Sequence, residues 1–256
     1  MIKHRSKGTA LTFLFIFFSC FAICQNSSKD SIVKRKSINL NEVGFFYEPQ
    51  QTWFFFLPSP GTYISKPTYK SSFGFIFGHY GKENSGLETG LIYSNQGQNY
   101  TKSQVYNYNS YYDSTTLNVF FKLSYFKIPI ILRVSGNPEK KFWANINLGM
   151  QICLLNNATY KIEDTEKSPY NYNQQVDIEP YLKRVDLNIV ASLGINFKIK
   201  NNFILFSGLR FDRSAFNVAK SSPYPDPPSS HSTNLGLMIG VKKILTPSSV
   251  EQKKEK

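Results

Sequence analysis

Few residues of this chain could do chemistry, and they are scattered. Three His and three Cys occur among 256 residues, and no Cys-x-x-Cys or His-x-x-x-His pair offers metal-ligand spacing. His231 stands in the Ser-rich stretch 229–232. A Ser-rich stretch places Ser beside His by chance, without a third group to orient the pair. The sequence therefore predicts no metal site, no cofactor and no enzyme.

Four charged residues interrupt stretches of otherwise apolar and small residues: Glu88, Asp186, Arg210 and Asp212. Each falls on the polar phase of a stretch in which every second residue is apolar, so each is expected inside a narrow barrel. There we expect a buried network of ion pairs and hydrogen bonds. The alternative is a path for protons or small solutes, which a filled interior argues against.

The elements that position these charges are predicted to be β-strands. Residues 185–200 alternate between apolar odd positions and mostly polar or small even positions, and residues 142–154 repeat the pattern. Such a period of two is typical of strands with one apolar face. We expect eight strands, within 41–57, 73–80, 87–96, 117–134, 142–154, 185–200, 203–212 and 234–241. Ten strands would result if 41–57 formed a hairpin.

One of these strands carries an irregularity. In residues 117–134 the apolar positions change from odd to even numbers. A shift by one residue turns every later side chain to the other face, so the pattern predicts a β-bulge just before Pro129.

The connections favour a membrane barrel over a soluble β-sandwich. In chain order they alternate strictly between long and short, and Asn201 and Asn202 supply turn residues at one short end. This alternation is typical of an up-and-down antiparallel barrel in an outer membrane, with short periplasmic turns and long external loops. The sequence thus predicts an all-β transmembrane barrel.

The N-terminal segment is predicted to be a signal peptide. Lys3, Arg5 and Lys7 precede an apolar run at 11–23 that is too short to span a bilayer as a helix. We expect cleavage after Cys24; acylation of a Cys is the less favoured alternative. The chain then divides into a signal peptide (1–24), a basic periplasmic leader (25–36), the barrel (37–245) and a charged periplasmic tail (246–256).

The net charge of +13 would ordinarily indicate nucleic-acid binding. In the predicted topology, however, the excess falls on the signal peptide, the termini and the short turns. We therefore expect no nucleic acid and a basic periplasmic rim suited to anionic lipid headgroups of the outer membrane, or to an acidic envelope protein. The predicted rim comprises Lys140, Lys141, Lys198, Lys200, Lys242 and Lys243.

A tyrosine cluster marks the second long connection. We expect it to lie outside the membrane, where it could stack on a sugar or contact a protein. Its alternative role is the interfacial aromatic girdle that membrane barrels display. The cluster comprises Tyr100, Tyr106, Tyr108, Tyr111 and Tyr112.

The most specific motif is Tyr125-Phe-Lys-Ile-Pro129, followed by an apolar run and the strand at 142–154. Together with 87–97, it resembles the core of the PorT-like outer-membrane β-barrel family of Bacteroidetes, with Tyr125, Ile128 and Pro129 at the positions of that core. Lys127 replaces the family's commoner acid or Gln. The resemblance implies an outer-membrane barrel, and it relates the chain to a component of a protein-secretion apparatus.

Together these observations predict a non-enzymatic outer-membrane barrel. We expect a structural or accessory component of an envelope or secretion assembly, which contacts partners through its loops or its basic periplasmic rim. A small porin-type channel for solutes is the alternative.

Overall fold

The computed structural model describes residues 40–54, 64–80, 85–106, 114–138, 140–164, 174–199, 202–220 and 230–245. The predicted signal peptide, leader and charged tail lie outside these residues. Among the described residues, no helix is long and apolar enough to cross a membrane.

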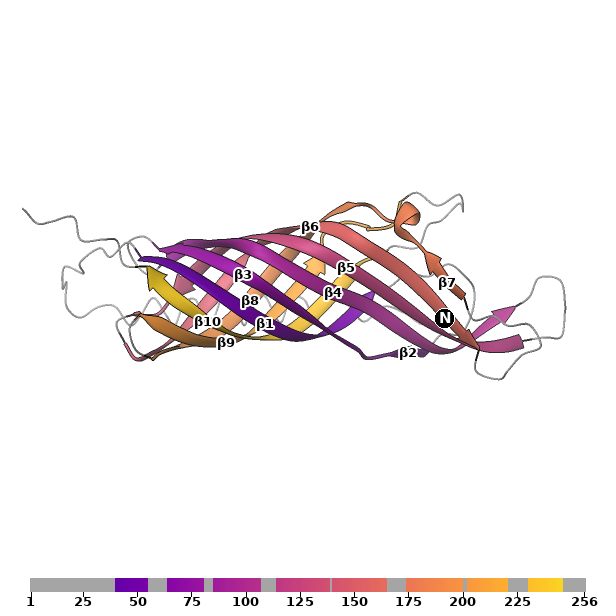
Figure 1. Cartoon of the computed structure of the whole chain (residues 1–256), viewed down its shortest axis with the longest axis horizontal. Helices are drawn as coiled ribbons and strands as arrows, with labels where there is room; N and C mark the ends of the chain where they lie inside the picture. Colours follow the sequence, from indigo (N-terminus) through magenta and orange to yellow (C-terminus); the bar gives the residue numbers. More distant parts are fainter. Residues whose placement is uncertain are drawn as a thin grey trace, which may run out of the picture. The chain divides into compact units, whose positions relative to one another are not determined.

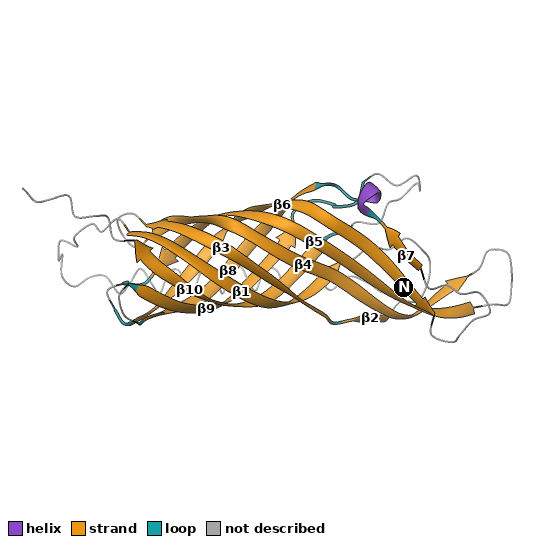
Figure 2. Ribbon diagram, in the orientation of Figure 1, coloured by secondary structure: helices purple, strands orange, loops and turns teal. Residues whose placement is uncertain are grey.

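Long β-strands make up nearly all of the described chain (Figures 1 and 2). Eight of them form the barrel: β1 (Leu40–Phe54), β3 (Thr68–Tyr80), β4 (Ser85–Tyr106), β5 (Ser114–Ser135), β6 (Phe142–Asp164), β8 (Val185–Lys198), β9 (Phe203–Ser214) and β10 (Ser232–Leu245). Two short strands and a 3-10 helix lie beyond them: β2 (Ile64–Lys66), β7 (Gln174–Asp177) and η2 (Glu179–Tyr181).

The eight strands close into a barrel. Each pairs antiparallel with the next barrel strand along the chain, and β1 pairs with β10 to complete the ring. The fold prediction of eight strands is confirmed. The ten-strand alternative is wrong, because residues 40–54 form one continuous strand rather than a hairpin. β2 and β7 only extend β4 and β6 at one end.

The two ends of the barrel differ in their connections. We call the end that carries 81–84, 136–141 and 199–202 the short-turn end, and the opposite end the loop end. In Figure 1 the arrowhead of β10 marks the short-turn end, and β7 lies at the loop end. Asn202 adopts a φ of 66°, a left-handed conformation that Asn tolerates in tight turns.

The outer wall is apolar and the inner face is largely polar. On β10 the outward residues Leu235 to Val241 are each about half exposed, whereas Asn234 and Lys242 on the inner face are almost completely buried. The same alternation repeats on β3, β8 and β9. This inversion of a soluble protein's pattern suits a wall in contact with lipid.

The predicted bulge in β5 lies elsewhere. Odd residues of β5 point inward throughout, from Val119 to Arg133, so the strand does not change phase. Instead the polarity of its inward residues changes along the strand. They are apolar toward the loop end, and charged residues join them nearer the short-turn end. The ladder does shift register between Ser124 and Tyr125, but the extra residue is Asn156 of β6.

Candidate functional site: the filled barrel interior

Inward side chains fill the barrel in layers that alternate between apolar and charged. β1 and β10 each pass through the layers in chain order, so their residues place the layers along the barrel. On β1 the order from the short-turn end is Glu42, Phe46, Glu48 and Phe54.

The first layer closes the short-turn end. Trp143, Ile204 and Ile244 pack together there, and all three are buried. They come from the ends of β6, β9 and β10. Because their side chains are apolar, they separate the interior from the water at this end.

The next layer is a buried charge cluster around Arg133. The guanidinium Nη1 lies 3.3 Å from Glu88 Oε2 and 3.4 Å from Glu42 Oε2. Lys242 Nζ lies 3.1 Å from the same Glu88 oxygen and 3.8 Å from that of Glu42. Arg133 also donates to Tyr80 Oη. Two cations thus face two carboxylates, which compensates charges that would be costly to bury singly.

Amides complete the hydrogen bonding of this cluster. Arg133 Nη2 donates to Asn196 Oδ1 at 3.1 Å and to Asn145 Oδ1 at 3.4 Å. Asn196 and Asn145 are themselves hydrogen-bonded to each other. The guanidinium is therefore held inside the barrel by side chains from five strands, β1, β3, β4, β6 and β8.

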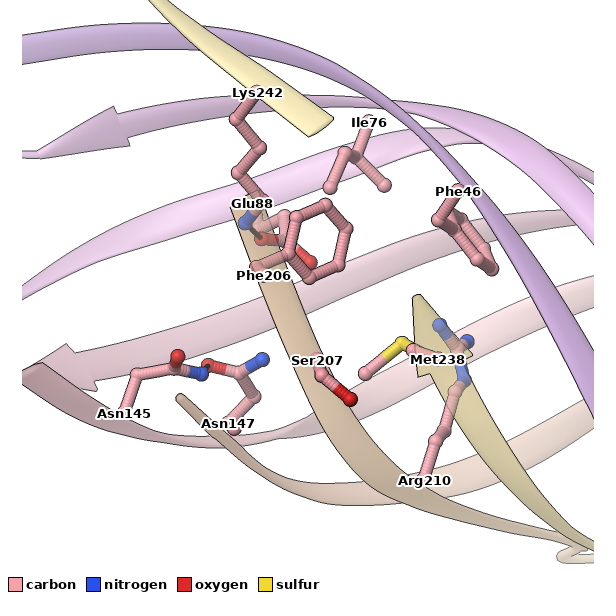
Figure 3. A pocket seen from close by; sticks show the side chains of 11 residues that line it. Phe46, Ile76, Glu88, Asn145, Asn147, Phe206, Ser207, Arg210, Met238 and Lys242 are labelled. Atoms are coloured by element: carbon pink, nitrogen blue, oxygen red, sulfur yellow. Dashed lines mark hydrogen bonds and ion pairs between the residues drawn. The ribbon is translucent and has the colours of Figure 1, made fainter. Parts of the chain in front are cut away.

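An apolar layer follows, built from Phe46, Ile76, Ile92, Phe206 and Met238. A cavity of about 10 Å³ lies beside it, which is room for roughly one water molecule. Figure 3 shows Lys242 and Glu88 beside Phe206 on one side of this cavity, and Arg210 with Met238 on the other. The Lys242 ammonium lies 4.6 Å from the centre of the Phe206 ring.

The second charged layer surrounds Asp212. Lys127 Nζ lies 3.1 Å from Asp212 Oδ2, while Asn234 and Asn188 donate to Oδ1 at 2.6 Å and 3.1 Å. The carboxylate therefore receives charge-assisted hydrogen bonds from three strands besides its own.

Arg210 and Asp186 lie at the edges of this layer. Arg210 donates to Gln151 Oε1 at 2.5 Å. Asp186 accepts from Ser214 Oγ at 2.7 Å and from the backbone amide of Leu187 at 2.8 Å. Both are hydrogen-bonded to neutral groups, and neither forms an ion pair with another residue of the described segments.

Several buried oxygens of this region have no hydrogen-bond partner among the residues that the structure describes. Among them are Glu48 Oε1, Gln50 Oε1, Asn188 Oδ1 and Asn234 Oδ1. Because buried polar atoms in proteins are nearly always satisfied by protein or by ordered water, we expect bound water to bridge them. The polar layer is therefore expected to hold a few bound waters.

An apolar layer closes the loop end. Phe54, Phe121 and Leu123 lie at its centre, and Ile178, Leu182 and Val218 cover it from the long connections. This cover is held by backbone bonds: Ile178 N donates to Ala158 O, and Lys183 N donates to Val218 O. Leu182 and Ala219 form an isolated β-bridge. Residues 178–184 and 217–220 of the two long connections thus form a roof over the barrel.

The structure places the four predicted interior charges inside the barrel but in different layers. Glu88 belongs to the Arg133 cluster, Asp212 and Arg210 lie in the second charged layer, and Asp186 lies beside Ser214. Among the described residues, the ion pairs of Glu42 and Glu88 with Arg133 and Lys242 share no member with the ion pair between Lys127 and Asp212. The charges therefore form two separate networks.

Sequence reasoning missed the cations that pair with these acids. Arg133 and Lys127 occupy odd positions of β5 and point inward. Arg133 is not singled out by the sequence pattern, and Lys127 stands out there only as a departure from the family motif. The strand's constant phase would have placed both inside. Glu42 and Glu48 lie on β1, whose alternation is less regular in sequence.

Lys242 is a correction to the predicted rim. Its side chain is only 4% exposed and pairs with Glu88, because even positions of β10 point inward. Lys140, Lys141 and Lys243 are exposed, Lys198 is half-buried, and Lys200 lies outside the described residues.

Tyr100 is a correction to the predicted external loop. It lies within β4, is 5% exposed, and donates through its hydroxyl to Phe54 O at 3.0 Å. β4 and β5 extend far into the stretch expected to be a loop. Tyr106 is the last residue of β4, and Tyr108, Tyr111 and Tyr112 fall outside the described part of the chain.

The core-motif residues divide between the two faces of β5. Tyr125 and Pro129 are buried and Ile128 faces outward. The β4 ladder lacks pairs opposite Ile128 and Pro129, as expected because proline has no N–H to donate.

Within the part of the Ser-rich segment that the structure describes, residues 230–232, no catalytic triad is assembled around His231. Asp186 accepts its side-chain hydrogen bond from Ser214, and Ser214 in turn contacts Ser232. His231 Nδ1 is buried without a hydrogen-bond partner. The acid thus does not orient the imidazole as a triad requires.

Residues 41–220 match the family model described as outer membrane protein beta-barrel domain. Similar solved structures include the major outer membrane protein from Thermus thermophilus (11% identity, 79% of this chain and 99% of that chain covered, TM-score 0.44). OprG from Pseudomonas aeruginosa is another (10%, 83% and 98%, 0.41), as is the neisserial surface protein NspA (12%, 79% and 96%, 0.39). Among curated proteins, none matches this chain.

Proposed function

This chain belongs to the outer membrane protein beta-barrel domain family, and from that premise we propose that it acts as a sealed, non-conducting barrel. Its place is the outer membrane. The observation that carries the proposal is the alternation of apolar and charged layers across the interior. The proposed role is structural or accessory, with the barrel as a rigid membrane anchor for the surfaces at its two ends.

Two features of the interior support a seal. Apolar layers lie at both ends and in the middle, so a hydrated ion would have to shed water three times. Between them, Lys127, Arg133 and Lys242 are bound to carboxylates that come from other strands. Opening a path would break these pairs and leave charges buried without partners.

The porin alternative lacks a comparable observation. An eight-stranded barrel is only wide enough for its own side chains to fill. The cavity beside Phe206 has room for roughly one water molecule, which is too small for a solute. A role in protein secretion, which the PorT-like motif implies, would then depend on contacts with partner proteins and not on transport through the barrel.

Planar-bilayer recordings test the seal. The refolded full chain should give no stepwise conductance at 1 M salt, whereas a large general porin inserted by the same protocol serves as the positive control. A variant in which Phe46 and Phe206 are both replaced by Ala removes the two aromatic rings of the middle layer and should also give no conductance, because the apolar layers at the two ends remain. Reproducible ohmic steps from the unaltered protein would refute the proposal.

A further inference from the structure

Two exposed lysines at the short-turn end lie over outward aromatic rings. Lys141 Nζ is 5.4 Å from the centre of the Phe197 ring, and Lys243 Nζ is 5.7 Å from that of Phe203. Both distances are within the range of a cation–π contact. The rings hold each ammonium group against the outer wall instead of leaving it free in water.

The two lysine–phenylalanine pairs lie on neighbouring strands of the barrel. Phe142, the residue after Lys141, pairs with Phe197 across β6 and β8, and Phe203 pairs with Lys243 across β9 and β10. The turn between β8 and β9 joins them, with Ile199 N donating to Phe203 O at 2.9 Å. Four neighbouring strands thus bring two cations to one sector of the wall.

This sector is the edge of the apolar band. Phe142, Ile199, Leu205 and Val241 are all exposed there, and they continue the outward apolar rows of their strands. A lysine whose stem covers such a surface places its ammonium at the boundary between hydrocarbon and water. In a bilayer that boundary is where lipid phosphate groups lie.

Neither lysine has an acidic partner among the described residues. Three other lysines are paired with carboxylates: Lys127 and Lys242 inside the barrel, and Lys161, whose Nζ lies 2.6 Å from Glu163 on the surface. The positive charge of Lys141 and Lys243 is therefore compensated by no described carboxylate. An anion from outside the chain would complete it.

We infer that Lys141 and Lys243, seated on Phe197 and Phe203, form a binding site for the phosphate of an anionic glycerophospholipid at the short-turn end. The aromatic rings and neighbouring aliphatic residues contact the upper acyl chain, while the two ammonium groups bind the headgroup. This inference goes beyond the sealed interior, because it concerns the outer wall alone.

Native mass spectrometry of the detergent-solubilised full chain tests the site. Titration with phosphatidylglycerol should give tighter binding than titration with phosphatidylcholine of the same acyl chains. The double variant Lys141→Gln and Lys243→Gln should weaken phosphatidylglycerol binding by about 30-fold, on the basis of two lysines near an anionic surface. The corresponding Lys→Arg double variant should retain it.

The control removes two exposed lysines from the loop end, Lys122→Gln with Lys183→Gln, and should leave binding unchanged. Heat-modifiable gel migration verifies that every variant is folded. Equal binding of both lipids by the unaltered protein would overturn the inference. So would loss of binding in the loop-end control, or a stronger preference for bisphosphorylated lipid A, which would place the anion site elsewhere or assign it to another lipid.

Discussion

At the scale of single residues, the interior depends on Arg133. It is 1% exposed and contacts Glu42, Glu88 and Tyr80 at once. A buried guanidinium suits this position because its planar fork can donate to several acceptors together. Lys242 alone would have to compensate both carboxylates if Arg133 were removed.

We expect Arg133→Met to lower the free energy of unfolding by about 3–5 kcal/mol, because it leaves a buried carboxylate without its partner. The measurement is urea-induced unfolding in lipid vesicles, followed by tryptophan fluorescence. Lys161→Met serves as the control: it removes an exposed ion pair with Glu163 and should cost less than about 1 kcal/mol. Equal effects of the two substitutions would contradict the buried network.

At the scale of elements, each strand has a lipid face and an inner face that tolerate different chemistry. Leu209 lies at the middle of the outer face of β9, between Leu193 of β8 and Leu237 of β10. Arg210, the next residue, is buried and hydrogen-bonded inside. A cation is thus accommodated at one position and excluded at its neighbour, because only the inner face supplies acceptors.

Leu209→Arg should therefore destabilise the folded barrel by about 2–4 kcal/mol, as expected for a cation facing lipid near the bilayer midplane. The same substitution at Leu245, the last residue of β10, should cost about 0–1 kcal/mol, because there the side chain reaches the interface. Reversible folding into vesicles measures both values. Equal costs at the two positions would show that the apolar band does not follow the strands as described.

At the scale of the whole barrel, the membrane wall and the roof at the loop end are distinct layers of one structure. The roof rests on Leu182, which is buried in the loop-end apolar layer and bridged to Ala219. The roof is hydrogen-bonded to β6 but takes no part in the strand pairing that closes the ring of eight strands. Its loosening should therefore affect the loop end without opening the barrel.

Leu182→Ala should remove about 2–5 kcal/mol of packing from the roof and accelerate protease cleavage within the long connections. Limited proteolysis of the protein in detergent micelles, read by mass spectrometry, measures the rate. Tyr181→Ala, at the exposed neighbouring residue, is the matched control and should cleave at the original rate. Unchanged cleavage of the Leu182 variant would mean that the roof is held by other contacts.

The sequence by itself determined the strands and their ring, because a period of two and alternating short and long connections leave few other arrangements. It also placed Glu88, Asp186, Arg210 and Asp212 on inner faces. Only the tertiary structure decided which charges meet: Lys127 with Asp212 and Arg133 with Glu88 are 85 and 45 residues apart.

Tertiary structure also decided where polarity reverses. In β5 the apolar residues Phe121 and Leu123 face inward, and Ile128 and Ile130 face outward, although the strand keeps one phase. A local pattern records which residues share a face, but whether that face meets lipid, water or the interior depends on how far the strand extends beyond the membrane. β4 extends through Tyr100 and β10 through Lys242, and the alternation of each strand then places both side chains inside, although the sequence predicts them outside.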